Sequence, residues 1–308
     1  MEVMEIATRA VGLQLVLASL LGLFSNFSAF HRFISLEKSS FNTLCASKTI
    51  SNSLSLLIYL CYLGPTHLLY TTIGSVVISS YINQALGFGL YVQGPLTQML
   101  ITINRFLVVW FTPTGTPSCS NPVTVAILLI TWTFVIYFST LIGFPDCLNP
   151  FGFDSPGARQ TDCNRRITWY MVYLVFFLAV FNNFLNVVIA GRLVWTSKYQ
   201  RLITSDVLRK RRQNTIRFFV QTCIQDWIFV LDIANNLLAT VVFENHTCRI
   251  LMTMAFDVMV YGVDGLVMFL FNHKMKSRKI GFAKKSVTDR NTEGNRNKKE
   301  DSPVSRNS

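Results

Sequence analysis

Residues 10–30 read AVGLQLVLASLLGLFSNFSAF, a run that contains no Asp, Glu, Lys or Arg. A helix needs about 20 mostly apolar residues to cross the hydrocarbon of a bilayer, and this run is long enough. A surface helix of a soluble protein instead keeps polar residues on one face. The run therefore predicts a transmembrane helix. Glu2 and Glu5 precede it, which does not suit the basic start of a cleaved signal peptide, so we expect this helix to stay as an anchor.

Six further apolar runs follow along the chain. The third is interrupted by Gly87, Gly89, Gly94 and Pro95, and its start could lie anywhere from 76 to 88. Membrane helices tolerate such residues where neighbouring helices satisfy the backbone. We predict an all-α membrane protein, a seven-transmembrane helix bundle with spans at residues 10–30, 49–70, 85–108, 122–143, 168–191, 218–242 and 250–271.

The composition agrees with a membrane protein and argues against several soluble classes. Of the 308 residues, 51% are hydrophobic and 14% are charged, whereas a soluble domain has about 25% charged residues. The net charge of +12 would favour nucleic-acid binding in a soluble protein, but here the basic residues lie between the apolar runs and in the tail. No zinc-type cysteine spacing, P-loop or dinucleotide-binding motif occurs. We expect no enzyme activity, no cofactor, no metal and no nucleic-acid partner.

Lysine and arginine residues are distributed unequally among the segments that join the spans. They concentrate in the segment 192–217 and in the tail 273–308, with a smaller group before the second span that includes Lys48. Because cytoplasmic segments carry the excess of Lys and Arg, we predict an N-terminus outside and a C-terminus inside. Residues 1–9 are then a short extracellular segment, and 273–308 are a basic cytoplasmic tail too poor in apolar residues to fold.

Asn104-Arg105-Phe106 stands at the predicted cytoplasmic end of the third span. A single arginine there could simply be an interface anchor whose charge reaches the headgroups. In the third of seven helices, however, it resembles the Asp/Glu-Arg-Tyr triplet of rhodopsin-like receptors. In that family the arginine helps to hold the inactive bundle closed and contacts the G protein after opening. Since Asn104 replaces the acid, we expect any restraint on Arg105 to come from another helix.

Three polar residues of other spans fall where rhodopsin-like receptors place theirs. Asn26 lies in the first span, Asn52 in the second, and Asp264 near the end of the seventh. An isolated carboxylate in lipid is costly, so we expect Asn26, Asn52 and Asp264 to form one cluster. The cluster could hold the helices together or could take part in switching. The replacement of the family's Asp by Asn52 disfavours a sodium site.

Further acids occupy the last two spans. Intramembrane acids indicate functional sites by default, and a ligand cation, a proton relay or a neutral hydrogen-bonded carboxyl would each fit. Asp257 lies nearest the predicted outer surface, so it is the candidate for contact with a ligand. The acids concerned are Asp226, Asp232 and Asp257, and the candidate aromatic residues of the pocket are Phe88, Tyr91, Phe176 and Tyr261.

The predicted outer segments contain cysteines and a glycosylation motif. Cys147 and Cys163 both lie in the segment 144–167, and outside the cell a disulfide between them is expected. Cys248 is the alternative partner for either. Asn245-His246-Thr247 is a sequon for N-glycosylation, although the segment that holds it is short and lies close to the membrane.

A narrower resemblance follows from five motifs in order. The chain resembles the nematode serpentine receptor class x family of chemoreceptors, within the rhodopsin-like superfamily, from about residue 10 to residue 275. The motifs are Ser40-Phe41-Asn42-Thr43-Leu44-Cys45, Gly94-Pro95-Leu96 with Ile103-Asn104-Arg105-Phe106, Cys147 with Cys163, Phe218-Phe219-Val220-Gln221 with Gln225, and Asp264-Gly265 with Phe271-Asn272.

The resemblance implies a G protein-coupled chemosensory receptor. It implies that an external small molecule binds in the bundle, that a heterotrimeric G protein is the inner partner, and that the plasma membrane of chemosensory cilia is the location. The alternative is a small-molecule or proton-coupled transporter or channel that uses the intramembrane aspartates. Against it, the two halves of the chain show no inverted repeat and no pair of broken helices.

Overall fold

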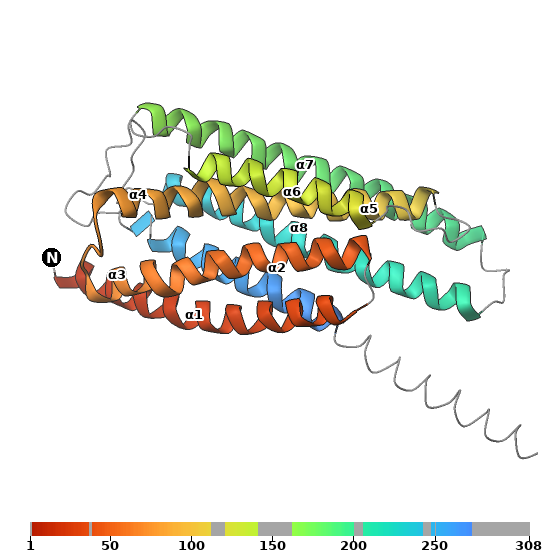
Figure 1. Ribbon diagram of the computed structural model, residues 1–308, viewed down its shortest axis with the longest axis horizontal. Helices are drawn as coiled ribbons and strands as arrows, with labels where there is room; N and C mark the ends of the chain where they lie inside the picture. Colours follow the sequence, from red (N-terminus) through yellow and green to blue (C-terminus); the bar gives the residue numbers. More distant parts are fainter. Residues whose placement is uncertain are drawn as a thin grey trace, which may run out of the picture. The chain divides into compact units, whose positions relative to one another are not determined.

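The computed structural model describes residues 2–36, 39–111, 121–140, 162–199, 206–242, 248–249 and 251–272. The chain divides into two units, Met1–Phe269 and Leu270–Ser308. The first is a bundle of helices (Figure 1), and the described part of the second is the last turn of its final helix. The predicted tail 273–308 lies outside the described residues.

Seven helical rods form the bundle, which confirms the predicted fold class. Two of the rods contain a π-helical segment, in which backbone hydrogen bonds join residues five apart instead of four apart. The rods are α1 (Glu2–Ser35); α2 (Ser40–Ile58) continued by η1 (Tyr59–Leu63) and α3 (Gly64–Leu69); α4 (Val76–Gln84) continued by η2 (Ala85–Leu90) and α5 (Tyr91–Phe111); α6 (Asn121–Thr140); α7 (Asp162–Tyr199); α8 (Asp206–Val242); and the final helix, Leu251–Asn272.

Several helices are longer than the apolar runs that predicted them. α7 continues to Tyr199 and α8 begins at Asp206, so much of the predicted inner segment 192–217 is helical. The second rod begins at Ser40, whereas the apolar run begins at 49. Its first turns are polar, but Ser39 caps them by accepting a hydrogen bond from the backbone N–H of Asn42. The assignment of Lys48 to an inner connecting segment is therefore wrong.

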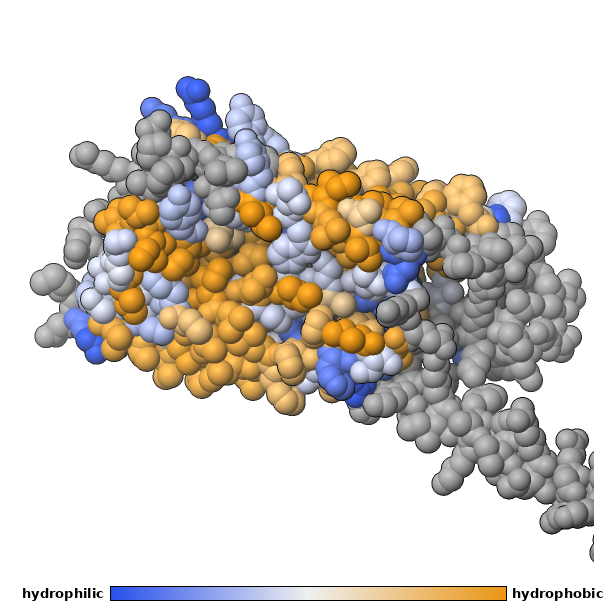
Figure 2. Space-filling model, viewed as in Figure 1, coloured by the Kyte–Doolittle hydropathy of each residue, from blue (hydrophilic) through white to orange (hydrophobic). Residues whose placement is uncertain are grey.

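The outer surface of the bundle is apolar over most of the face seen in Figure 2. Leu21 and Phe24 on α1 are each 73% exposed, which is the side-chain arrangement of a helix surrounded by lipid. Helices long and apolar enough to cross a membrane, by length and composition, include Met4–Ser35, Ser40–Leu69, Trp169–Trp195 and Leu251–Asn272. The helix Asn121–Tyr137 is apolar but shorter.

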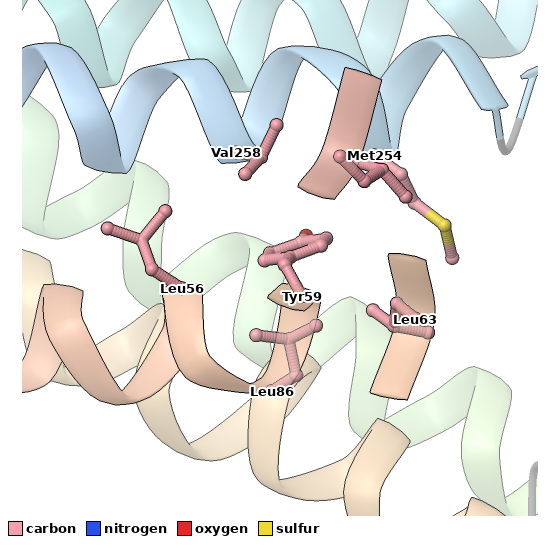
Figure 3. Close-up of a cluster of buried hydrophobic side chains, with 7 residues drawn as sticks. Leu56, Tyr59, Leu63, Leu86, Met254 and Val258 are labelled. Atoms are coloured by element: carbon pink, nitrogen blue, oxygen red, sulfur yellow. The ribbon is translucent and has the colours of Figure 1, made fainter. Parts of the chain in front are cut away.

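The apolar core packs the first, second, third and last rods together at the end of the bundle where the chain begins. Tyr59, Leu63 and Leu86 from the two π-helical segments meet Leu56 of α2 and, on the final helix, Met254 and Val258 (Figure 3). Pro65 is the second residue after η1, and without an N–H it cannot donate a backbone hydrogen bond to that segment. The core thus fixes the backbone from which Tyr59 projects.

Gly265 of the final helix packs against the Asn26 side chain of α1. A Cβ atom added there would lie 2.3 Å from Nδ2 of Asn26, well inside van der Waals contact. The same Asn26 nitrogen donates to the carbonyl oxygens of Gly22 and Tyr261 at 2.9 and 3.1 Å. Only glycine leaves room for these bonds.

We predict that Gly265→Ala lowers the midpoint of thermal unfolding of the detergent-solubilised protein, because overpacking a buried site costs about 1–3 kcal/mol. Gly191→Ala on α7 is the matched control, since a Cβ at Gly191 meets no atom within 4 Å. Alanine at an open helical site is about 1 kcal/mol more favourable than glycine, so the control should melt at the same temperature or higher. Equal melting of Gly265→Ala and the wild type would contradict the close approach.

Candidate functional site

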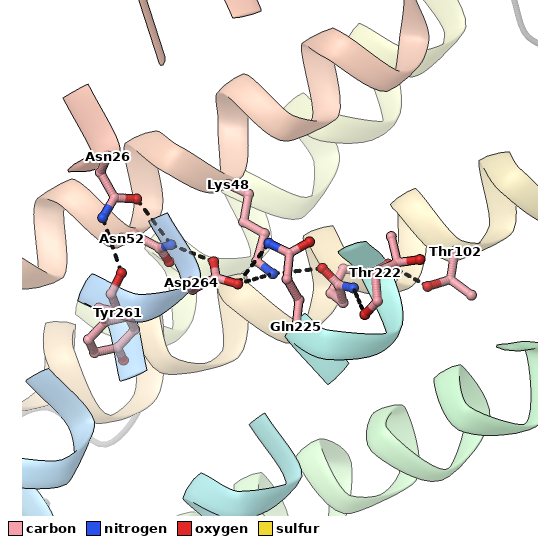
Figure 4. A network of polar contacts seen from close by, with 9 residues as sticks. Asn26, Lys48, Asn52, Thr102, Thr222, Gln225, Tyr261 and Asp264 are labelled. Carbon is pink, nitrogen blue, oxygen red and sulfur yellow. Dashed lines mark hydrogen bonds and ion pairs between the residues drawn. The ribbon is translucent and has the colours of Figure 1, made fainter. Parts of the chain in front are cut away.

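The Asp264 carboxylate is the centre of a buried polar network that joins α1, α2, α5, α8 and the final helix (Figure 4). Its Oδ1 lies 3.0 Å from Nζ of Lys48 and accepts a hydrogen bond of 2.8 Å from Nε2 of Gln225. Its Oδ2 accepts a hydrogen bond of 2.6 Å from Nδ2 of Asn52. Three donors, one of them cationic, therefore compensate the charge of a carboxylate that is 6% exposed.

Asn26, Asn52 and Asp264 lie together, as the sequence predicts. Asn52 donates to Oδ1 of Asn26 at 3.3 Å, so α1 joins the network through the side chain of α2. What the sequence analysis missed is Lys48, which is 5% exposed and turned into the bundle. Its ammonium group lies beside Asp264 and supplies a positive charge there.

A second branch of the network leads from Lys48 along α5 and α8. Lys48 Nζ donates to Oε1 of Gln98 at 2.6 Å, and Nε2 of Gln98 donates to the backbone carbonyl of Thr222 at 3.3 Å. The Thr222 hydroxyl in turn donates to the carbonyls of Phe218 and Phe219 at 3.2 and 2.8 Å. Thr222 lies one helical turn from Phe218, whose ring contacts Arg105.

Arg105 is buried between two aromatic rings. Its guanidinium carbon lies 4.2 Å from the centroid of the Phe41 ring on α2 and 4.8 Å from that of Phe218 on α8. The two rings are themselves in contact, with centroids 4.8 Å apart. Arg105 is 8% exposed, and within the described residues its Nε has no hydrogen-bond partner. The restraint expected from another helix therefore comes from two aromatic faces rather than from an acid.

The neighbours of Arg105 in the motif have different surroundings. Asn104 is buried, as an uncharged residue facing the bundle can be. Phe106 packs against Trp110 on the same helix, with ring centroids 5.7 Å apart. Neither of these contacts supplies a charge to Arg105.

Two aspartates from different helices form a second polar site. The carboxyl group of Asp232 on α8 interacts with Asp257 of the final helix and with the hydroxyl of Tyr91. Asp257 accepts hydrogen bonds of 3.4 Å from the Tyr59 hydroxyl and from Nδ2 of Asn236. Asp257 is therefore part of a carboxylate pair, a partnership that the sequence analysis did not predict. We call Asp232 and Asp257 the acid pair.

Both π-helical segments border the acid pair. Tyr59 is the first residue of η1, and Tyr91 directly follows η2, where its backbone N–H reaches back to the carbonyl of Leu86. A π-helical turn changes the direction of the side chains that follow it, and such turns are frequent at functional sites. Here they direct two tyrosine hydroxyls from separate rods toward the same carboxylates.

A cavity of about 560 Å³ lies between α2, α5, α7, α8 and the final helix. The network borders it through Lys48, Gln98 and Asp264, and the acid pair borders it through Asp232. Two of the predicted ligand-contact residues, Tyr91 and Tyr261, also line it. Its wall is mostly apolar with a few polar groups, which is the usual character of a small-molecule site.

Other predicted pocket residues lie elsewhere. Phe88 packs in the apolar cluster of Val92, Met171 and Val175 and is absent from the cavity wall. Phe176 is 58% exposed on α7, so its assignment to the pocket is wrong. The reason is geometric: the apolar run of α7 is charge-free around most of its circumference, and composition does not tell which face turns inward.

Of the two cysteines predicted to form a disulfide, only Cys163 lies among the described residues. Cys163 is disulfide-bonded, whereas Cys248 is a free thiol, so the alternative pairing through Cys248 is wrong. Cys147 and the glycosylation candidate Asn245 both lie outside the described residues, and the pairing of Cys147 with Cys163 stays a prediction.

The residues missed by sequence reasoning share a simple signal. Lys48 is four residues before Asn52 on α2, and Gln98 is seven before Arg105 on α5, spacings that place each pair on one helix face. Polar residues at such spacing in a membrane helix point to a shared interior partner. Lys48 carries this signal, but its positive charge equally fits the excess of basic residues in a cytoplasmic segment, and the sequence alone does not distinguish the two.

Comparison with known proteins places these features in a family. The model of a protein family described as "Serpentine type 7TM GPCR chemoreceptor Srx" matches residues 16–272 of the chain. Among solved structures, squid rhodopsin is similar in fold, with a TM-score of 0.67 and 13% sequence identity over 84% of this chain and 77% of the rhodopsin chain. At this identity the likeness concerns the fold alone. No curated protein sequence matches the chain.

Proposed function

This chain belongs to the Srx family of serpentine seven-transmembrane GPCR chemoreceptors, and from this we propose how it detects a ligand. It is a multi-pass membrane protein and a G protein-coupled chemosensory receptor, and its family and fold are those of receptors, which generally are not enzymes. We propose that an external small molecule binds in the cavity and shifts the bundle between two arrangements, which a heterotrimeric G protein reads near Arg105.

The observation that carries this proposal is the path of hydrogen bonds from the cavity wall to the backbone of Phe218, whose ring contacts Arg105. Asp264 and Gln98 border the cavity, Gln98 binds the backbone at Thr222, and Thr222 lies one turn from Phe218. A ligand that moves α8 relative to α5 therefore acts on the same helix that supplies one of the two rings around Arg105. Gln98 and Arg105 are seven residues apart on α5, so the path covers about 10 Å along the helix at 1.5 Å per residue.

Coupling over this distance requires an element with two arrangements. The contacts of Arg105 supply it, because a cation over an aromatic ring contributes about 0.5–2 kcal/mol, depending on burial. Displacement of Phe218 would release the guanidinium from one face and leave it available to a partner at that end of the bundle. Gln225, hydrogen-bonded to Asp264, is the residue of α8 that links such a movement to the final helix.

The orientation follows from the charge distribution. We propose that the end of the bundle with the acid pair faces outward and the end with Arg105 faces the cytoplasm, as the excess of Lys and Arg in the inner segments favours. In this orientation the ligand enters from outside and the G protein binds from inside. We propose the plasma membrane of sensory cilia as the location, as the membership in a chemoreceptor family suggests.

A cavity-filling variant tests the ligand site. Ala179 lines the cavity from α7, whereas its neighbour Val180 is 53% exposed on the lipid side. Ala179→Phe should raise the ligand concentration for half-maximal G protein dissociation at least about tenfold, a loss of about 1.4 kcal/mol, with normal surface expression. Val180→Phe adds a ring of the same size and should respond like the wild type. The measurement is a panel of volatile and water-soluble odorants on cells that express each variant.

The opposite pattern would contradict the proposed site. If an odorant activates the wild type and Ala179→Phe equally, the ligand binds elsewhere. If Val180→Phe loses the response as strongly as Ala179→Phe, the effect belongs to packing of α7 in the membrane and not to the cavity.

A further inference from the structure

We infer that the cavity recognises a small organic cation, a protonated amine or a quaternary ammonium group, through the acid pair Asp232 and Asp257. The inference rests on the proposed function, because it names the ligand class of the same cavity. It also reaches beyond it, since a receptor of this fold could equally bind a neutral odorant. Three independent features of the site support a cation.

The first feature is an unpartnered carboxylate oxygen in the cavity wall. Asp232 is 2% exposed and lines the cavity, and among the described residues its Oδ1 has no hydrogen-bond partner. A buried acceptor without a donor costs about 1–3 kcal/mol, and more when it is charged. A ligand N–H or ammonium group placed in the cavity would supply the missing partner.

The second feature is an excess of acid over base. In the part of the chain that the structure describes, Lys48 is paired with Asp264, and the other ion pair is the exposed Arg9–Glu5 contact. Neither Asp232 nor Asp257 has a basic residue within ion-pair distance there. Two adjacent carboxylates repel each other when both are ionised, so the pair takes up one positive charge, either a proton or a ligand cation.

The third feature is the aromatic lining. Tyr91, Phe229 and Tyr261 line the cavity together with Asp232, and the faces of such rings attract organic cations. A metal ion is a poorer fit, because no group of three or more His, Cys, Asp or Glu side chains is placed to hold one within the described ranges. Hard metal cations need about six oxygen ligands, whereas an ammonium group is satisfied by the Asp232 carboxylate and aromatic walls.

The other acid in the wall provides a control. Asp226 also lines the cavity, but Nδ2 of Asn186 on α7 donates a short hydrogen bond to its Oδ2. This oxygen therefore already has a donor, and the groups that act on Asp226 belong to the network around Lys48, Gln98 and Asp264 and not to the acid pair. Asp226→Asn removes one carboxylate from the same cavity without touching the pair.

The test compares charged and neutral compounds of equal shape on the full-length receptor in lipid nanodiscs. The probes are choline against 3,3-dimethylbutan-1-ol and butylamine against butan-1-ol, and the measurement is the rise in unfolding midpoint that each compound causes. We expect at least one ammonium probe to raise the midpoint at concentrations up to about 10 mM, which covers affinities in the millimolar range, and its neutral counterpart to have no effect. Asp232→Asn should abolish the rise, whereas Asp226→Asn should retain it.

The wild-type comparison keeps the test decisive even if a variant folds poorly. Equal stabilisation by the charged and neutral probes, or none by either ammonium compound, would overturn the inference. Retention of the ammonium effect in Asp232→Asn would overturn it as well. These outcomes do not bear on the cavity as an odorant site, which is tested separately: that site is excluded if Ala179→Phe leaves the odorant response unchanged.

Discussion

Replacing Lys48 with alanine is expected to remove most of the receptor from the cell surface and to lower the unfolding midpoint of what remains. Lys48 is 5% exposed, and it is the cation among the three donors to Asp264. Removal of one partner of a buried ion pair leaves an uncompensated charge and costs about 3–5 kcal/mol. A protein of ordinary stability has about 5–15 kcal/mol in total, so the effect is large.

The second partner provides the control for this variant. Lys48→Ala combined with Asp264→Asn removes both charges, and because asparagine still accepts from Asn52, the double variant should regain much of the surface expression. Arg9→Ala breaks the exposed pair with Glu5 and should change nothing, since exposed ion pairs contribute about 0–1 kcal/mol. Surface labelling and thermal unfolding check all three. A Lys48→Ala protein that is expressed and melts like the wild type would show that the ion pair does not hold the bundle.

Removal of one ring beside Arg105 is expected to raise signalling in the absence of ligand. Phe218→Leu keeps an apolar side chain but loses the aromatic face 4.8 Å from the guanidinium. The lost contact, about 0.5–2 kcal/mol, shifts the equilibrium toward the open arrangement by a factor of about 2–30. Basal nucleotide exchange on the G protein should rise by the same factor. Adding Arg105→Ala to this variant should then remove the exchange, because the group read by the partner is gone.

A second cation–π contact supplies the matched control. Arg192 on α7 lies 5.1 Å from the ring centroid of Trp110 on α5, and no polar path from the cavity ends there. Trp110→Leu should leave basal exchange at the wild-type level. If Trp110→Leu and Phe218→Leu raise it equally, the rise reflects a general loosening of the bundle rather than release of Arg105.

The number and position of the helices could be predicted because the membrane constrains them strongly. An uncharged run such as residues 10–30 permits almost no alternative to a lipid-facing helix. Helix ends could not be predicted as well, because polar turns outside the hydrocarbon continue a helix without any hydropathy signal. Lys48 shows the consequence. The predicted second span begins at 49 and α2 begins at Ser40, so the prediction places a buried ion-pair partner in a connecting segment.

The polar cluster could be predicted in part. The positions of Asn26, Asn52 and Asp264 in their helices are enough to expect contact, because each would otherwise be costly in lipid. The acid pair could not be predicted in the same way. Its partnership depends on the rotation of α8 and the final helix about their axes, and the π-helical segments that direct Tyr59 and Tyr91 toward it depend on tertiary packing.

The aromatic surroundings of Arg105 illustrate a further limit. Asn104 in place of an acid shows that a local ion pair is absent, but not what replaces it. Phe41 and Phe218 belong to sequence motifs of the second and sixth spans, and only the assembled bundle brings both rings to the same guanidinium.

The central claim is that ligand binding in the cavity is reported to a G protein through the Arg105 end of the bundle. The most direct measurement uses the purified receptor in lipid vesicles with a purified heterotrimeric G protein and an activating odorant or ammonium compound from the panels above. We predict that the compound accelerates nucleotide exchange on the G protein and that Arg105→Ala abolishes the acceleration while the compound still stabilises the receptor. Flux of the compound across vesicles that lack any G protein, without accelerated exchange when the G protein is present, would contradict the account.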